Sequence, residues 1–187
     1  MELKQQFLKI AGDYTNWNVY RKSLIVCDVN EMFIRRYSLR LTRTADQMRQ
    51  AARSCKQNLV EGITDATVSM EMGIRLVGIA RGSGRELLED YQDYLRQNQL
   101  VTWQRSDSRA IQARRYCRLY DDPSQFVAKC SQRTDETVAN IMLTQLHQLD
   151  AMLGAVLRKM GEIFINEGGI KEQMSQVRRD WRRRNGQ

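Results

Sequence analysis

The chain of 187 residues holds a single proline and a single histidine, and glycine is also sparse. This scarcity excludes collagen-like and proline-rich chains and argues against a sandwich of short strands joined by many turns. With His147 as the sole imidazole, a zinc site built on two histidines is excluded. The cysteines lack the C-x-x-C spacing of zinc and redox motifs, so we expect them to fill the core as small apolar residues. They are Cys27, Cys55, Cys117 and Cys130.

Long apolar runs are missing as well. No segment approaches the roughly 20 apolar residues that a membrane-spanning helix needs. Residues 1–6 (MELKQQ) lack the apolar region of a secretory signal. We therefore expect a cytoplasmic protein with reduced thiols and no membrane partner. The sequence also lacks a phosphate-binding glycine loop and a dinucleotide-binding motif, and we expect no cofactor.

Helical periodicity dominates the sequence. Apolar residues recur at steps of three and four, and no stretch of useful length alternates with the period of a strand. The predicted fold class is all-α. We expect helices at residues 17–39, 44–62, 67–97, 108–120 and 134–166, and a short basic helix near the C-terminus. The longest would extend about 48 Å at 1.5 Å per residue. Such rods pack lengthwise, which predicts an antiparallel four-helix bundle with an additional C-terminal helical extension.

The bundle is expected to be interrupted along the chain. Residues 1–100 would supply its first three helices. Residues 101–133 would form a connector with a short basic helix, which the sequence DDPS at 121–124 ends. Residues 134–187 would then supply the long fourth helix and the short basic C-terminal helix.

Local signals predict two helix ends and one close contact. Thr44 and Gln47 have the spacing of a capping box at the start of the second helix, and Gly62 is expected to end that helix. Gly82 and Gly84 lie in the middle of the third helix, where together they cost about 2 kcal/mol relative to alanine. This cost predicts a close approach of the helix backbone to a neighbour, with a kink as the alternative.

Two segments resemble the signatures of a known family. Residues 47–62 read QMRQAARSCKQNLVEG and residues 80–86 read ARGSGRE. They resemble the patterns Q-x-x-x-A-x-x-S-x-x-x-N-x-x-E-G and A-x-G-S-x-x-E of the four-helix-bundle proteins, also called the 23S rRNA intervening-sequence proteins. Residues 146–150 and 164–169 resemble a longer subgroup with a helical suffix. The matching residues of the two signatures are Gln47, Ala51, Ser54, Asn58, Glu61, Gly62, Gly82, Ser83 and Glu86.

The resemblance implies a fold and an assembly more than an activity. It implies a closed homo-oligomer, with a pentamer favoured. Some members resemble the accessory variability protein of diversity-generating retroelements, which works with a reverse transcriptase and nucleic acid. We expect the motif residues to be structural: Asn58 and Glu61 would satisfy groups at a helix end, and Gly82 and Ser83 would let helices approach closely. A ligand site is the alternative.

Basic residues outnumber acidic ones by 30 to 22, which gives a net charge of +8 and favours an anionic partner. On the second predicted helix, Arg49, Arg53 and Lys56 follow i, i+4, i+7 spacing and share one face. Cations with this spacing can follow a phosphate backbone. The alternatives are a solvated face and salt bridges to the next helix.

A second basic cluster lies at the C-terminus. Residues 178–187 contain five arginines against one aspartate, which accounts for half of the net charge. Trp181 lies among them, where an indole can stack on an unpaired base. Alternatively, Trp181 packs with Met174 and Val177 and docks the last helix on the bundle. The five arginines are Arg178, Arg179, Arg182, Arg183 and Arg184.

Two further groups of polar residues were considered as catalytic or metal sites. Four carboxylates share one face of the third predicted helix, but no second acidic cluster matches them. We therefore expect pairing with arginines of a neighbouring helix or protomer rather than a metal site. His147 and Asp150 also share a helix face, and an interface pair is favoured over a nuclease fragment. The four carboxylates are Glu86, Glu89, Asp90 and Asp93.

The sequence thus predicts a non-enzymatic, basic helical protein that oligomerises and binds nucleic acid, RNA rather than DNA, as a scaffold or accessory subunit. The alternative is a protein-interaction adaptor, for example an accessory factor of a reverse transcriptase in a diversity-generating retroelement. A third class is a bundle hydrolase that uses the acidic face.

Overall fold

The computed structural model describes residues 14–37 and 42–185. These residues form helices and contain no β-strand, which confirms the all-α prediction. Residues 1–6, used above for the absence of a signal, lie outside the described residues. The elements are η1 (Tyr14–Asn16), α2 (Asn18–Arg36), α3 (Arg43–Asp65), α4 (Met70–Gln97), α5 (Ser108–Leu119), α6 (Pro123–Cys130), α7 (Asp135–Glu167) and α8 (Ile170–Arg184).

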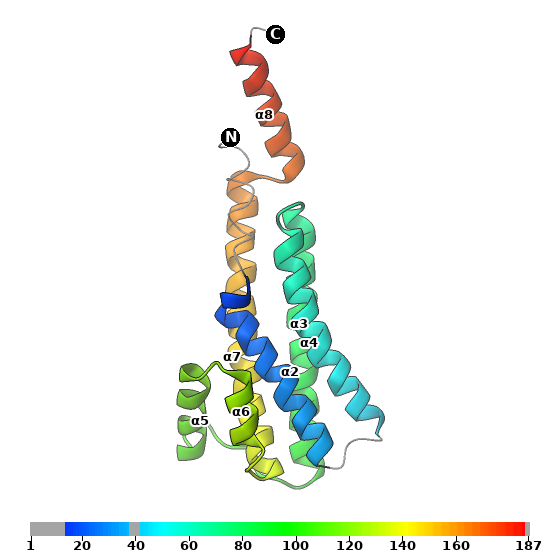
Figure 1. Ribbon diagram of the computed structural model, residues 1–187, viewed down its shortest axis with the longest axis vertical. Helices are drawn as coiled ribbons and strands as arrows, with labels where there is room; N and C mark the ends of the chain where they lie inside the picture. The colour runs from blue at the N-terminus through cyan, green and yellow to red at the C-terminus, as the bar shows by residue number, and fades with distance from the viewer. Residues whose placement is uncertain (1–13, 38–41, 186–187) are drawn as a thin grey trace.

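Four helices, α2, α3, α4 and α7, lie lengthwise against one another (Figure 1) and are called the helical core below. The most extensive contacts join α3 to α4 and α4 to α7, while α2 packs on both α3 and α7. Their apolar sides meet in one continuous cluster, in which Phe33, Leu59, Tyr91 and Leu149 are fully buried. The burial of these stripes holds the helices together.

A buried polar link joins three helices of this core. The Tyr91 hydroxyl on α4 donates to Asn30 Oδ1 on α2 at 3.0 Å. Asn30 Nδ2 in turn donates to the backbone oxygen of Met48 on α3 at 3.1 Å. Asn30 is only 1% exposed, so these hydrogen bonds offset the cost of removing its amide from water.

Helices α3 and α4 approach each other closely at Gly62 and Gly73. A Cβ built on Gly62 would lie 2.9 Å from the backbone oxygen of Gly73, and one built on Gly73 would lie 2.7 Å from that of Gly62. The prediction that Gly62 ends its helix is therefore wrong. Helix α3 continues to Asp65, and the glycine is there because backbone atoms of α4 occupy the place of a side chain.

Helix starts are set by side-chain caps, which shift some predicted ends. Thr42 Oγ1 accepts a hydrogen bond from Ala45 N at 3.1 Å, so α3 begins at Arg43. The predicted capping box of Thr44 and Gln47 is wrong, since Thr42 is the capping residue. Helix α2 ends at Arg36, earlier than predicted; Leu39, its expected last residue, lies outside the described residues.

The connector holds two helices rather than the single one predicted. The residues expected to break the basic helix instead start α6: Asp122 Oδ1 accepts from Gln125 N at 3.0 Å, and Pro123 occupies the first turn. Proline is well suited to that position because its missing N–H has no helical partner there. The segment that leads into α5 is fixed on α7 by Asn140, whose Oδ1 accepts from Trp103 N at 2.8 Å.

Lys22 fastens this connector to the helical core. Its ammonium donates to the backbone oxygen of Cys117 on α5 at 2.7 Å, and to the side-chain oxygens of Gln145 and Gln148 on α7 at 2.7 and 2.8 Å. Lys22 is 8% exposed, and burial lowers its pKa, an effect that the neighbouring Cys117 and Asp121 oppose. Three oxygen atoms thus take the place of water around a buried cation.

Helix α7 ends at Glu167 and is capped by Gly168, whose φ of 73° is a left-handed conformation that glycine adopts without strain. The chain then turns into α8, which projects beyond the end of the helical core (Figure 1). None of the described helices is long and apolar enough to cross a membrane.

Candidate nucleic-acid interface

The predicted basic face of α3 is partly consumed by ion pairs. Arg49 donates to Glu31 Oε2 on α2 at 2.8 Å and to Asp46 Oδ1 at 3.3 Å. Burial acts to raise the pKa of Glu31, but hydrogen bonds from Arg49 and Arg35 outweigh it and lower that pKa. Arg53 is exposed and Lys56 is half-buried. The three cations thus lie on one side of α3, but Arg49 is paired with Glu31 of the neighbouring helix α2.

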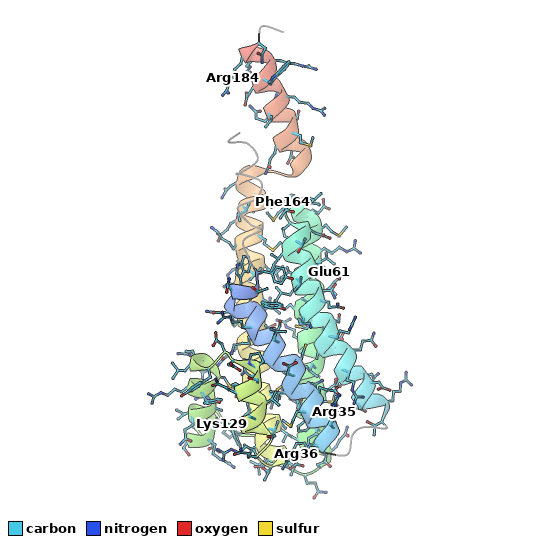
Figure 2. The ribbon with its side chains drawn as sticks, viewed as in Figure 1. Arg35, Arg36, Glu61, Lys129, Phe164 and Arg184 are labelled. Carbon is cyan, nitrogen blue, oxygen red and sulfur yellow. The ribbon has the colours of Figure 1, made fainter. Side chains whose placement is uncertain are left out.

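The cations of α8 have different surroundings. The five arginines from Arg178 to Arg184 are exposed, and none forms an ion pair with a carboxylate among the described residues. Arg179 donates to the neutral side chains of Ser175 and Gln176. Asp180, which lies between Arg179 and Arg182 in the sequence, accepts a hydrogen bond from Gln176 at 3.1 Å. The positive charge of α8 therefore remains available to a partner (Figure 2).

Trp181 does not dock α8 on the helical core. Trp181 is 57% exposed. Met174, which lies about two turns earlier on the same side of the helix, is 48% exposed. Docking predicts that both would be buried. The indole is instead open to solvent among the arginines, as the stacking prediction requires.

Two arginines of α4 form ion pairs with α7. Arg81 donates through Nε and Nη2 to the two carboxylate oxygens of Asp150 at 2.7 and 2.9 Å, and Arg85 Nε donates to the same carboxylate at 2.7 Å. Hydrogen bonds from Arg81 and Arg85 lower the pKa of Asp150 despite an opposing effect of burial. His147 is exposed. Asp150 thus serves a contact between α4 and α7 within the chain, rather than an interface pair with His147.

Three of the motif residues meet between α3 and α4. The hydroxyl oxygens of Ser54 and Ser83 lie 2.9 Å apart, and Asn58 Nδ2 donates to the backbone and side-chain oxygens of Ser54 at 2.9 and 3.0 Å. Asn58 therefore bonds within its own helix rather than at a helix end. Ala51 is buried beside these residues.

Apart from the buried Gly62, the remaining motif residues lie on the outside of the chain. Gln47, Glu61, Gly82 and Glu86 are exposed, and Glu61 lies within α3 rather than at its end. Among the described residues, no atom outside its own helix lies within 4 Å of a Cβ built on Gly82. The prediction that Gly82 admits a neighbouring helix of this chain is therefore wrong, and Gly62 and Gly73 fill that role.

The acidic face of α4 keeps most of its charge uncompensated. Asp93 pairs with Arg96 of the same helix at 2.8 Å, whereas Glu86, Glu89 and Asp90 form no ion pair within the described part of the chain. Burial, then the charges of Asp93 and Glu86, raise the pKa of Asp90. The described ranges contain no group of three His, Cys, Asp or Glu side chains placed to hold a metal ion.

One feature was missed at the level of the sequence. Residues of α5, α6 and α7, together with Trp103, line a cavity of about 580 Å³ with basic and aromatic walls. The available signal was the alternation of arginines and tyrosines over residues 114–120. Its meaning depends on α6, which was predicted as a break.

Comparisons with family models, with curated proteins and with solved structures find no match for this chain.

Proposed function

We propose that the protein is a non-enzymatic, basic helical subunit that oligomerises and binds nucleic acid, RNA in preference to DNA, as a scaffold or accessory factor. The observation that carries the proposal is the state of α8, where five arginines and a tryptophan are exposed and no carboxylate of the described residues neutralises the arginines. Each guanidinium that contacts a phosphate releases condensed counterions, which drives binding. The exposed indole of Trp181 adds a stacking surface for an unpaired base.

For the architecture, we propose that α2, α3, α4 and α7 form an antiparallel four-helix bundle of the family named above, with α8 as its extension. The hydroxyl contact between Ser54 on α3 and Ser83 on α4 supports this assignment, since both family segments meet there. The cytoplasm suits the four free thiols, of which Cys55, Cys117 and Cys130 are buried.

The outer face of α4 supports the closed homo-oligomer, with a pentamer favoured. Gly78 and Gly82 point away from the rest of the described chain, where glycine costs a helix about 1 kcal/mol per residue without any contact that requires it. Ile79 and Met72 on the same side are 45% and 44% exposed. Close approach of a second copy would bury these apolar side chains and give both glycines a role.

A protein-interaction adaptor, such as a reverse transcriptase accessory factor, remains a second candidate. The specific observation in its favour is the apolar side of α8, where Met174 and Trp181 are uncovered next to the arginines. An acidic protein surface with an apolar groove would engage both sides of this helix. Nucleic acid would engage the arginines and the indole.

The test compares two variants that each remove two exposed arginines. Arg182→Ser/Arg183→Ser acts on α8, and Arg43→Ser/Arg158→Ser removes the same charge elsewhere. Fluorescence anisotropy with matched single-stranded RNA and DNA over a salt series measures affinity. We expect tight RNA binding by the wild type, and a slope of log K against log salt that falls by about 0.7 per lost contact in the α8 variant.

Two results would overturn the proposal. If both double variants bind equally, the charge as a whole and not α8 is responsible. If the wild type binds neither nucleic acid at low salt, the adaptor is the better candidate. For the assembly, a light-scattering mass near 21.9 kDa would contradict the oligomer. Ile79→Glu is expected to lower the mass of an assembly that uses the outer face of α4.

A further inference from the structure

A basic and aromatic cavity lies where the connector packs on α7, away from α8. Its volume of about 580 Å³ falls within the range of roughly 300–1,000 Å³ that small-molecule sites occupy. Thr137 and Ile141 of α7 contribute to its lining, together with residues of α5 and α6 and Trp103 from the preceding segment. It thus combines residues from four separate parts of the chain.

The lining contains four cations and no carboxylate: Arg109, Arg115, Lys129 and Arg133. Arg109 is held by Asp107 at 2.8 Å and by Glu136 at 3.5 Å, and its guanidinium lies 5.1 Å from the centre of the Trp103 ring. Arg115 and Arg133 form no ion pair with a carboxylate within the described ranges. Arg115, Lys129 and Arg133 thus place positive charge around the cavity that no ion pair with a described carboxylate compensates, and such charge favours an anion.

Aromatic rings form the other half of the lining. Tyr116 and Tyr120 are stacked, with ring centroids 4.4 Å apart and an angle of 27° between their planes. Tyr120 is 48% exposed, so the stack presents a ring to a planar ligand. Lys129 on α6 (Figure 2) lies 4.3 Å from the centre of the Tyr116 ring, and Phe126 supports that ring from the buried side at 5.0 Å.

Trp103 adds a third aromatic residue to the lining. Its indole Nε1 is buried and has no acceptor among the described residues, which is costly for a buried N–H group. The backbone of Trp103 is meanwhile fixed by Asn140, so the ring holds its place beside Arg109.

We propose that this cavity binds a nucleoside phosphate, with the base stacked on Tyr120 and the phosphate held by the cations of the lining. The chemistry required is a flat aromatic group joined to an anion, and the base and phosphate of a nucleotide supply both. The same chemistry is offered by a free mononucleotide and by one unit of a single strand. The site goes beyond the proposed function because it involves neither α8 nor the oligomer.

The experiment uses Trp103 as the reporter in a Trp17→Phe/Trp181→Phe background of the full chain. Emission is titrated with adenosine monophosphate, uridine monophosphate, inorganic phosphate and a single-stranded oligonucleotide. We expect saturable changes with nucleotides and a weaker response to phosphate. Tyr120→Ala is expected to weaken nucleotide binding about tenfold through lost stacking. Arg115→Glu should weaken it by at least that much.

Arg118→Glu is the matched control, because Arg118 is an exposed arginine of α5 outside this cavity and the change of charge is the same. A change of less than threefold in the control supports the site. Mononucleotide binding points to a free nucleotide, and oligonucleotide binding alone, lost in Tyr120→Ala, points to a strand. The proposal is overturned if Arg115→Glu and Arg118→Glu act equally, or if no nucleotide binds. Loss of RNA binding in the α8 variant leaves this result unaffected, so the two proposals fail separately.

Discussion

The arginines of the helical core and those of α8 meet opposite surroundings. Arg81 and Arg85 lie on a face of α4 and converge on Asp150 of α7, while Arg182 and Arg183 on α8 are exposed and form no ion pair within the described residues. Basic residues in the core thus tie helices together, and those of α8 remain free to bind. The neighbouring element, and not the spacing of the cations, decides which of the two occurs.

The largest effect is expected from two glycines of α4, one inside the core and one outside. Gly73→Ala places a Cβ 2.7 Å from backbone oxygen of Gly62, so the helices must separate, and we expect a loss of about 3 kcal/mol in the free energy of unfolding. Within a single protomer Gly82→Ala meets no described atom, so the dissociated chain should gain about 1 kcal/mol in the free energy of unfolding. Urea unfolding measures both free energies of unfolding. If both substitutions destabilise the protein, or both stabilise it, the difference between the two glycines is refuted.

A smaller effect is expected at the arginine cluster of the core. Asp150→Asn leaves Arg81 and Arg85 without a charged acceptor and should destabilise the protein by about 2 kcal/mol. Because the pKa of Asp150 is lowered in the fold, its contribution is present above the ordinary value of 3.8 and is lost as pH falls below it. The gap between wild type and variant should therefore narrow in acid. A gap that stays constant down to pH 2 would contradict this assignment.

The smallest effect on stability is expected in α8. Trp181→Ala should change the free energy of unfolding by less than about 0.5 kcal/mol, since the indole is mostly exposed. The same variant should weaken RNA binding about fivefold or more through lost stacking. A loss of stability above about 2 kcal/mol would instead mean that the indole docks the helix, and would remove the difference between α8 and the core.

Helical periodicity sufficed to predict most of the elements. The helices at 67–97, 108–120 and 134–166 were placed to within a few residues, because their apolar stripes face one side. The sequence does not predict α6, because the pattern around Pro123 indicates a break, although proline after an aspartate cap also favours a helix start. Residues 121–124 fit both a break and a helix start. The burial of Phe126 in the core shows that they start a helix.

Contacts between helices could not be predicted in the same way. Gly62 and Gly82 look alike in the sequence. Only the packing of the helices shows that a Cβ at Gly62 would meet the backbone of α4, whereas a Cβ at Gly82 would meet no described atom. The pairing of Arg49 with Glu31 likewise requires that α2 and α3 be neighbours. The cavity combines Trp103 with residues of three helices, so no single segment contains its pattern.

The buried ammonium of Lys22 couples the stability of the connector to that of the helical core. If α5 were to lift away, this cation would lose the Cys117 carbonyl and keep only its hydrogen bonds to the two glutamines. Partial detachment is therefore penalised, and the connector and α2 should open together as one cooperative unit. Amide protons of α5 are then expected to exchange with solvent as slowly as those of α2, although α5 lies at the periphery.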